Sequence, residues 1–590
     1  MHTTHIGQVD PAVCLRVSDT PVGSDRRAVC GDSDRYAATD YGSGGMDKMW
    51  AGGICGIISA MHAQGETTLT LGGGPLSLEM LDPLLEQKLT VTIGEGAWQR
   101  VQRSRDIVEQ AIADGRVLYG INTGFGHLKS ITIPEDQLEQ LQENLIRSHA
   151  VGVGAPACEQ VVRWMILFKV HSLLQAHSGV RRETIELLAG MFNADCLPIV
   201  PSKGSLGASG DLAPLAHMTL PMIGEGTVTI PKSKGQRAVG LSPRGLPNPE
   251  RTALPAKDAF AKLALEPIKL QPKEGLALLN GTQYMSAMAA VCVIRARRLA
   301  KHADIIAAMS LEGFRGSASP FDERLHKIRP HAGAQIVAAN MRALLADSEI
   351  MASHADCDRV QDPYSFRCIP QVHGASRDAI EHAAGIVETE INSVTDNPII
   401  FDNGDIISGG NFHGQSLALV MDYMAIALAE LASIAERRTY LLLEGRDDLP
   451  PMLTKDPGIN SGLMMLQYTA AALVNENKVL ATPASIDTIT TSGGQEDHVS
   501  MGATSANKLM TILENAETVL AIEMLCAAQA LDFRVPLKAG TGPQIAVDIL
   551  RGTVARVDQD RCFDADIAAA VRILQDQTVA VAIRQKLPLS

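Results

Sequence analysis

The sequence predicts a mainly α-helical protein, with a core bundle of long helices and a mixed helix-and-strand region at the N-terminal side. Hydrophobic residues make up 46% of the 590 residues, but aromatic residues only 4%. Such a composition, rich in Ala, Leu, Ile and Met, is typical of helices packed on helices rather than of a β-sandwich. Three long stretches, 282–312, 416–444 and 503–534, contain neither Gly nor Pro. These stretches predict the long helices of the bundle.

Residues 1–64 are rich in Gly, Ser, Asp and Thr and lack sustained periodicity. We expect them to be poorly ordered, or to lie upstream of a true start near Met61. The folded domain is then expected to span residues 65–590.

The N-terminal part of that domain alternates short strands, helices and glycine-rich loops. The predicted elements are β-type runs at 69–71 and 89–93, helices at 97–113, 135–147 and 159–176, and a glycine-rich loop at 119–126. Residues 231–257 carry Pro, Lys, Gly and Arg and are expected to form a surface excursion.

The stretch 416–444 shows the helical pattern most clearly. Its apolar residues recur at steps of three and four: Leu417, Val420, Met424, Leu428, Leu431 and Ile434. Helices this long indicate a buried bundle, a membrane span or a coiled coil. Charged residues interrupt the apolar run and disfavour a membrane: Asp422, Glu430, Glu436 and Arg437. The abundance of Ala favours close packing, including packing between subunits.

Charge and cysteine usage narrow the classes of function and the compartment. A net charge of −14 argues against nucleic acid or an anionic membrane as the main partner. The ten cysteines are dispersed without a Cys-x-x-Cys pair, which indicates reduced thiols rather than disulfides or a zinc site. No signal peptide is visible, so we expect a soluble, cytoplasmic protein.

One glycine-bracketed stretch, 204–211, is a candidate source of chemistry. Glycines flank Ala208 and Ser209, so the backbone can bend sharply here. If the Gly210 nitrogen attacks the Ala208 carbonyl, a five-membered ring closes. Loss of water and then of the Ser209 hydroxyl leaves an exocyclic methylidene. The product is a strong electrophile, which no ordinary side chain supplies.

The same stretch has other interpretations. An isolated Ala-Ser-Gly is ordinarily a polar surface turn. A P-loop needs Gly-Lys-Ser/Thr, which is missing, and a nucleophile elbow needs Gly-x-Ser-x-Gly, whereas Gly210 follows Ser209 directly. A serine hydrolase using Ser209 and a non-catalytic helical scaffold are the alternatives from other functional classes.

Further polar side chains fall in loops or at helix ends, where scaffolds often present reactive groups. Each has an ordinary structural alternative: Tyr119 as a turn cap, His149 as a match to a helix C-terminus, and Asn280 or Thr282 as a helix N-cap. As a base, Tyr119 would need a pKa well below its usual value of about 10.

The run 361–367 combines an amide, a phenol and a guanidinium in Gln361, Tyr364 and Arg367. A planar guanidinium suits bidentate pairing with a carboxylate, and an ordinary surface arginine is the alternative. Glu496 and His498 are of metal-ligating types, but no His-Glu-x-x-His or matched motif accompanies them. We therefore expect no metal.

Taken together, these stretches resemble the aromatic amino acid ammonia-lyase family. The motifs that carry the resemblance follow the family's order over roughly residues 66 to 580: 119–126, 204–215, 278–283, 361–367, 394–398 and 409–413. The resemblance implies a long-helix bundle of the ammonia-lyase/fumarase-like type, with 65–590 as the catalytic domain. It also implies a methylidene-imidazolone (MIO) group made from Ala208, Ser209 and Gly210, and no external cofactor.

The resemblance further implies roles for individual residues. Tyr119 would take the substrate's β-proton, and Arg367 would hold its carboxylate. Asn280, Gln361 and Tyr364 would position the amine and the prosthetic group. The nucleophile that meets the methylidene is either the substrate amine or its ring.

The site would be completed by two more side chains and by other subunits. Phe412 would wall the prosthetic ring, and Glu496 would assist proton transfer if burial raises its pKa. The resemblance implies a homotetramer whose sites draw residues from several chains.

Within the family, two places resemble the histidine-selective members: Ser148-His149 and the run 495–498. An imidazole offers a ring donor and acceptor that His149 and Glu496 can meet, whereas a phenyl ring would leave both groups unpaired. Sites of this kind reject the wrong analogue by about 10⁴–10⁵-fold. The expected reaction turns L-histidine into urocanate and ammonia, the first step of histidine degradation. A phenylalanine or tyrosine ammonia-lyase and an aminomutase are the alternatives within the family.

Overall fold

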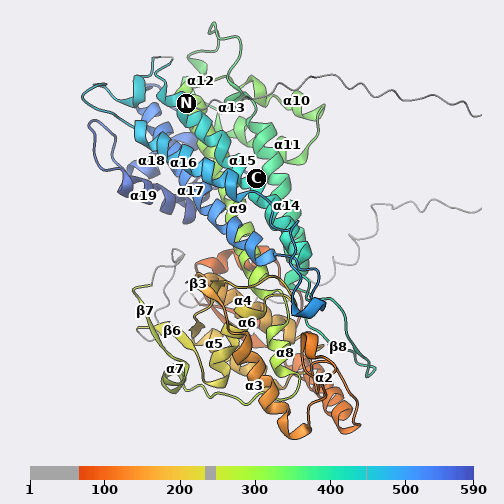
Figure 1. Ribbon diagram of the computed structural model, residues 1–590. Helices are drawn as coiled ribbons and strands as arrows, with labels where there is room; N and C mark the ends of the chain where they lie inside the picture. The colour runs from red at the N-terminus through yellow and green to blue at the C-terminus, as the bar shows by residue number, and fades with distance from the viewer. Residues whose placement is uncertain (1–65, 233–247, 447) are drawn as a thin grey trace, which may run out of the picture. The chain divides into compact units, whose positions relative to one another are not determined.

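The computed structural model describes residues 66–232, 248–446 and 448–590, which all lie in one compact unit, Ile57–Ser590. These residues are mostly helical: long helices lie side by side in a bundle, and the short strands belong mainly to the N-terminal part (Figure 1). This arrangement confirms the predicted mainly α fold with a mixed N-terminal region. The expectation for residues 1–64 lies outside the described residues.

Four long helices form the bundle core. They are α9 (Gln283–Phe314), α14 (Ile369–Ile391), α15 (Gln415–Leu443) and α17 (Gly502–Asp532). α9 packs against the other three, and nearly every one of its residues is buried. The three long helices expected from the absence of Gly and Pro are thereby confirmed, each to within a few residues.

α15 shows why a helix can be apolar without facing lipid. By length and composition α15 could cross a membrane, but two thirds of its most apolar window is buried inside the protein. All six apolar residues of the predicted stripe, from Leu417 to Ile434, are buried. α15 therefore packs as a core helix of the bundle.

Shorter helices surround this core. They are α10 (Glu323–Lys327), α11 (Ala332–Leu344), α12 (Glu349–Ala352), α13 (Tyr364–Arg367), α16 (Met464–Leu480), α18 (Thr541–Arg551), α19 (Asp564–Gln575) and α20 (Thr578–Arg584). Charges buried between the long helices are paired: Arg438 with Glu523 at 2.6 Å and Arg295 with Glu517 at 2.7 Å. Pairing offsets the cost of removing these charges from water.

The N-terminal part begins with β1 (Glu66–Leu71) and β2 (Lys88–Ile93), which pair in parallel around α1 (Leu78–Leu81). This pair confirms the two β-type runs. The helices that follow are α2 (Glu95–Ala113), α3 (Leu138–His149), α4 (Glu159–Leu173), α5 (Arg182–Asn193), α6 (Leu212–Thr219), α7 (Ala256–Leu263) and α8 (Glu274–Leu279).

The remaining strands form small sheets that brace the loops. β3 (Val153–Pro156) pairs with β5 (Pro201–Lys203), and β8 (Ile399–Ile400) with β9 (Ile406–Ile407). The three-stranded sheet has the order β4 (Leu197–Pro198), β6 (Thr227–Pro231) and β7 (Arg251–Pro255).

The expected surface excursion at 231–257 is wrong for its last part. Residues 251–255 form β7, and Arg251 is buried with its guanidinium 2.6 Å from Asp195. Asp195 also pairs with Arg163 at 2.6 Å. The polar composition suggested exposure, but this charge is buried because a shared carboxylate compensates it.

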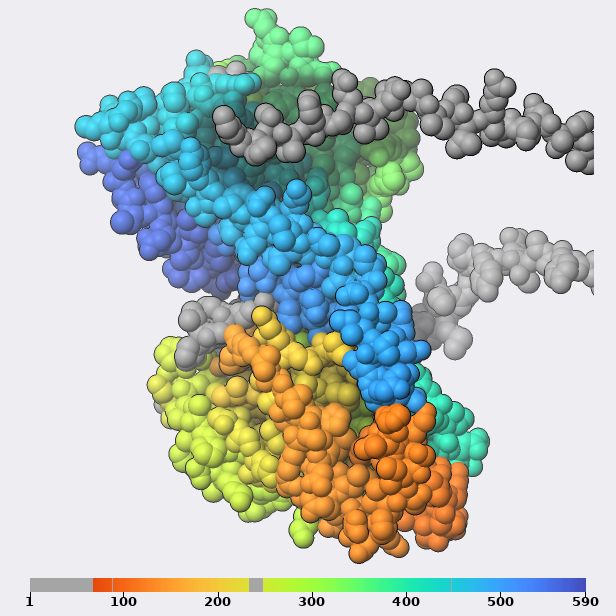
Figure 2. All heavy atoms as spheres, viewed as in Figure 1, coloured from red at the N-terminus to blue at the C-terminus, as the bar shows by residue number. Residues whose placement is uncertain are grey.

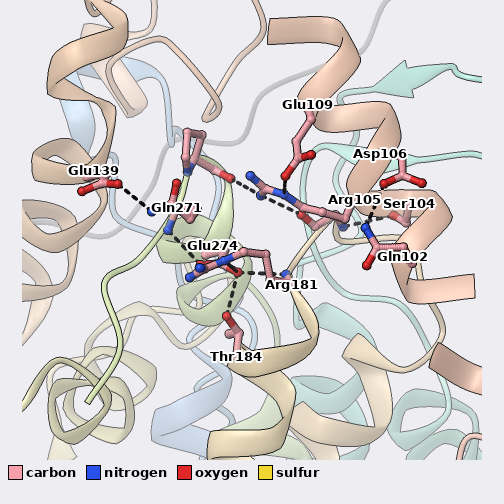
Figure 3. Close-up of polar contacts among 12 residues, drawn as sticks. Gln102, Ser104, Arg105, Asp106, Glu109, Glu139, Arg181, Thr184, Gln271 and Glu274 are labelled. Atoms are coloured by element: carbon pink, nitrogen blue, oxygen red, sulfur yellow. Dashed lines mark hydrogen bonds and ion pairs between the residues drawn. The ribbon is translucent and has the colours of Figure 1, made fainter. Parts of the chain in front are cut away.

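The start of α8 is anchored by one buried carboxylate (Figure 3). Glu274 accepts hydrogen bonds from the Arg181 side chain at 2.8 and 3.1 Å and from the Thr184 hydroxyl at 2.6 Å. The backbone nitrogens of Arg181 and Gln271 each donate to the same carboxylate at 2.8 Å. Beside it, Arg105 donates to the carbonyls of Gly179 and Pro272. α8 is thus fixed at one end, and its other end leads into the candidate site.

Candidate active site

The stretch that contains Ser209 forms a tight loop immediately before α6. Ser209 has a φ of +51°, and Gly207 and Gly210 have values of +77° and +80°. Gly207 and Gly210 also face each other as an isolated antiparallel bridge. A non-glycine residue in the left-handed region is costly unless its surroundings impose it. The glycines of this loop allow the bend, but contacts with the surrounding structure must impose the positive φ of Ser209.

The connection from α8 to α9 imposes that conformation. Gly281 donates from its nitrogen to the Ser209 carbonyl at 3.3 Å and accepts from the Asp211 nitrogen at 2.8 Å. A Cβ at position 210 would stand 2.1 Å from the Gly281 oxygen, so only glycine fits there. The backbones of Gly210 and Gly281, which are far apart in the sequence, are thus in close contact next to Ser209.

Two further contacts hold the sides of the loop. Asp211 is fully buried and accepts from the Met285 nitrogen at 2.9 Å, and burial raises the pKa of its carboxyl to about 7. The Met501 nitrogen donates to the Leu206 carbonyl at 2.9 Å. The loop is consequently clamped between the starts of α9 and α17.

A pocket of about 590 Å³ opens over Ser209. Its wall includes five of the residues named from the sequence: Tyr119, His149, Ser209, Asn280 and Glu496. The segment that carries Glu496 belongs to the C-terminal half of the chain. It is joined to the N-terminal part of the pocket by a hydrogen bond from the His127 nitrogen to the Ser492 hydroxyl at 3.2 Å. In Figure 2, blue atoms from this half lie against the orange N-terminal part.

Tyr119 is partly buried in this pocket, and its hydroxyl accepts from the Gly126 nitrogen at 3.3 Å. Burial raises the pKa of the phenol, and the nearby Glu496 carboxylate raises it further. The lowered pKa that a base would need is therefore not produced by the side chains of a single chain. The Gly126 N–H opposes this rise, and a nearby cation or further hydrogen-bond donors at the phenol oxygen would lower the pKa.

His149 is the last residue of α3, and its Nδ1 lies 2.8 Å from the Leu145 carbonyl. With the hydrogen on Nδ1, the ring donates to that carbonyl and Nε2 is left as an acceptor. Burial lowers the pKa of this imidazole, which favours the neutral ring. His149 thus caps its own helix and also lines the pocket. Glu496, which lines the same pocket, accepts from the Thr491 hydroxyl at 3.0 Å.

Asn280 is 2% exposed and does not cap α9 with its side chain. Its side-chain nitrogen donates to the Asn397 backbone carbonyl at 2.8 Å, and its backbone carbonyl accepts from the Lys169 ammonium at 2.6 Å. The Lys273–Asp396 ion pair, at 2.6 Å, lies beside it. Buried charges therefore surround the residue that precedes Gly281.

Gln361 and Arg367 line a different hollow, of about 760 Å³, together with residues 315–320. Arg367 lies over the ring of Tyr364 with its guanidinium carbon 4.4 Å from the ring centre, and its Nε donates to the Asp362 carbonyl at 3.1 Å. The Tyr364 side chain is 71% exposed. The structure of one chain does not bring these three side chains to the pocket over Ser209.

α9 explains the separation. The pocket includes Asn280, just before the helix begins, and the hollow includes Arg315, just after it ends. A helix of 32 residues is about 48 Å long. One amino acid cannot touch both ends, so a single chain presents two incomplete sets of groups.

Phe412 is half-buried in the turn before α15 and does not line the pocket of its own chain. The adjacent His413 ring stacks on that of His498, with centroids 5.9 Å apart. Among the described residues, no group of three or more His, Cys, Asp or Glu side chains is arranged to hold a metal ion.

Sequence reasoning missed several residues that fix the site, including Lys169, Lys273, Gly281 and Ser500. A Cβ at Gly207 would stand 2.0 Å from the Ser500 hydroxyl. Lys169 had a signal: it is the cation within the otherwise apolar residues 164–170 of α4. Gly281 could be noticed within its motif, but its contact with Gly210 could not be seen in the sequence.

The family model for "Aromatic amino acid lyase" matches residues 76–552. The chain belongs to the aromatic amino acid lyase family. The match spans the loop with Ser209, the pocket around it and the hollow around Arg367. Both sets of groups therefore belong to one family domain of the chain.

Relatives of this aromatic amino acid lyase domain are similar over most of their length. The chain is 49% identical to a "Histidine ammonia-lyase" of Gloeobacter violaceus over 86% of this chain and 96% of the relative. It is 45% identical to one of Myxococcus xanthus over 88% and 98%.

Solved structures of the family are also similar to this chain over most of their length. A histidine ammonia-lyase from Trypanosoma cruzi is similar with a TM-score of 0.79 and 40% identity, over 88% of this chain and 96% of that one. A tyrosine aminomutase from Streptomyces globisporus has a TM-score of 0.80 at 34% identity, over 89% and 100%. The fold of the family thus serves more than one substrate.

Proposed function

We propose that the protein eliminates ammonia from L-histidine and releases urocanate. The pocket over Ser209 supports this proposal, because the phenol of Tyr119, the imidazole of His149 and the carboxyl group of Glu496 line it together with Ser209. The similarity to relatives named histidine ammonia-lyase supports the choice of substrate.

We infer that Ala208, Ser209 and Gly210 form a methylidene-imidazolone group by the loss of two waters. The bend at Ser209 and the glycine-only contact at position 210 fit such a ring. Gly281 and Asp211 would hold the ring on its inner side. When formed, the group supplies the electron sink that an amine needs in order to leave.

Tyr119 is the proposed base for the β-proton. A placed base accelerates proton removal by about 10²–10⁴-fold. The phenol must lose its proton first, and a cation near it would favour that loss. Arg367 of a second copy and the substrate's own ammonium are the cations proposed for this.

His149 and Glu496 are proposed to select the imidazole ring of the substrate. The neutral His149 presents Nε2 as an acceptor toward a ring N–H. The Glu496 carboxylate accepts from the other ring nitrogen when the substrate ring is an imidazolium, which carries a proton on both nitrogens. A phenyl ring would desolvate both groups and return no hydrogen bond, which is the basis for rejecting phenylalanine.

A second copy of the chain is proposed to supply Gln361, Tyr364 and Arg367, with Phe412, to the pocket over Ser209. The 32-residue α9 separates these groups from Ser209 within one chain. The long helices also expose large apolar side chains, including Leu419, Tyr423 and Ile426 of α15. Such surfaces favour association, and a homotetramer with shared sites would cover them.

The cytoplasm is the proposed compartment. The described cysteines are all free thiols, including the exposed Cys357 and Cys562. Free surface thiols are typical of a reducing environment.

A panel of amino acids tests the proposed reaction. Purified full-length protein should release ammonia from histidine with the largest kcat/KM, and the product should be urocanate. A preference for tyrosine or phenylalanine, or a β-amino acid as product, would assign the chain to another activity of the family. Labelling of Ser209 by a serine-directed phosphonate would instead support a hydrolase.

A further inference from the structure

Lys169 is a buried cation that contacts the backbone of Asn280, next to the Gly281 nitrogen that donates to Ser209. It lies on α4, is 2% exposed, and donates to two neutral carbonyls: that of Asn280 at 2.6 Å and that of Ala277 at 3.2 Å. Burying an ammonium is expensive. A sequence that required only a filled core would place an apolar residue here, as at positions 164–168 of the same helix.

The Asn280 carbonyl belongs to the same peptide unit as the Gly281 nitrogen. That nitrogen donates to the Ser209 carbonyl at 3.3 Å. Because this peptide unit is planar and trans, its oxygen and its N–H point in opposite directions. The ammonium of Lys169, the Asn280–Gly281 peptide and the Ser209 carbonyl therefore form one chain of hydrogen bonds. A charge at one end of such a chain polarises the donor at the other end.

The Ser209 carbonyl is the oxygen whose charge matters for the proposed electrophile. Ring closure removes the Ala208 carbonyl oxygen but keeps that of Ser209, which is then conjugated with the methylidene carbon. A carbonyl conjugated in this way takes up negative charge when a nucleophile adds. Hydrogen-bond donors fixed at such an oxygen favour that charge strongly.

We propose that Lys169 is a positioning residue that aims and polarises the Asn280–Gly281 peptide against the Ser209 carbonyl. This inference rests on the proposed function, because it assigns Lys169 to the electrophile formed at Ser209. Lys169 acts through the peptide and touches no reacting atom.

The charges around Lys169 are compatible with this role. Burial lowers the pKa of its ammonium to about 7, against the attraction of Asp396 and Asp211, and the neighbouring Lys273 lowers it as well. Lys273 is itself held by Asp396 at 2.6 Å. Lys169 is therefore left to the two carbonyls as its direct contacts.

The test replaces Lys169 with Met and compares it with Arg163→Met. Arg163 is a buried cation on the same helix, but it pairs with Asp195. In Arg163→Met, Asp195 still has Arg251 as an ion-pair partner. Intact mass, the near-UV band of the prosthetic group, and kcat and KM for histidine are measured for each full-length variant.

We expect Lys169→Met to form the group, with its near-UV band shifted to shorter wavelength. Its kcat should fall by about 10–100-fold, the usual effect of losing a supporting contact, with a smaller change in KM. Arg163→Met should keep the wild-type band and kcat. If Lys169→Met does not fold, Lys169→Gln is measured instead, with the same shifts expected at smaller size.

Two results would overturn the inference. A folded Lys169 variant with the wild-type band and kcat would show that the ammonium does not act on Ser209. A folded variant that lacks the mass deficit would place Lys169 in ring formation instead. If wild-type protein itself lacks the deficit and the band, it is the proposed function that fails.

Discussion

The pocket over Ser209 and the hollow around Arg367 hold their functional groups in different ways. The first is built by its own chain: Asn280 is 2% exposed, and Gly281 and Asp211 lock the loop with backbone hydrogen bonds. In the second, the Arg367 guanidinium lies over a Tyr364 side chain that is 71% exposed.

This difference indicates that the groups at the two ends of α9 have different roles. A strained loop that must make an electrophile needs a rigid setting within one chain. Groups that only bind a carboxylate can be presented outward and delivered to another copy. The predictions below test whether the two ends have these separate roles.

Removal of the Ser209 hydroxyl should have the largest effect. Ser209→Ala cannot form the methylidene, so histidine turnover should fall by roughly 10⁴–10⁶-fold, the scale of losing a covalent catalytic group. Intact mass and ammonia release measure both losses in one preparation. Substantial turnover by this variant would remove the electrophile from the account.

Tyr119→Phe should keep the prosthetic group and lose about 10²–10⁴-fold in kcat. A base must be deprotonated, so wild-type kcat/KM should rise with pH through the pKa of the phenol, and the variant should lack that limb. A near-native rate would exclude the phenol as the base.

Substitution at the other end of α9 should have an intermediate effect. Arg367→Lys should raise KM and lower kcat, because an ammonium lacks the planar fork; a loss of about 1.5–3 kcal/mol corresponds to roughly 10–150-fold in kcat/KM. Loss of fold is checked by comparing the melting temperature with that of the wild type.

Mixed oligomers test whether the two ends meet between copies. Ser209→Ala and Arg367→Met chains, expressed together, should regain up to about one quarter of wild-type activity, since random mixing leaves that share of shared sites intact. No gain over the two separate variants would mean that each site uses a single chain.

Glu312, near the end of α9, is expected to make the stability of the protein depend on pH. We expect no effect of this residue on activity. Burial raises the pKa of this carboxyl to about 7. A carboxyl whose folded pKa is raised loses its contribution to stability as pH rises from about 4.5 to about 7. Glu312→Gln should therefore lose less melting temperature between pH 5 and pH 8 than wild type, whereas the exposed Glu266→Gln should match wild type.

The sequence predicted the bundle because its signal is local and repeated. Leu417 to Ile434 recur at helical spacing, and all six residues of that stripe are buried. The Gly- and Pro-free stretches located α9, α15 and α17 to within a few residues, although α9 continues through Gly313 and α17 includes Gly502. β7 was missed because Arg251 looks like a surface residue until Asp195 is placed beside it.

The site was predictable as a set of residues but not as an arrangement. Motifs named Tyr119, His149 and Ser209, which the fold brings to one pocket. The interlock of Gly210 with Gly281 depends on two backbones far apart in sequence. The pKa of Tyr119 depends on burial and on Glu496, and its direction could not be obtained from the loop 119–126.

The intact mass of purified, active full-length protein tests the central claim most directly. The account predicts a mass lower than that of the unmodified polypeptide by two waters, with the deficit located in the peptide that contains Ala208, Ser209 and Gly210. An active preparation in which that peptide has its full, unmodified mass would contradict it.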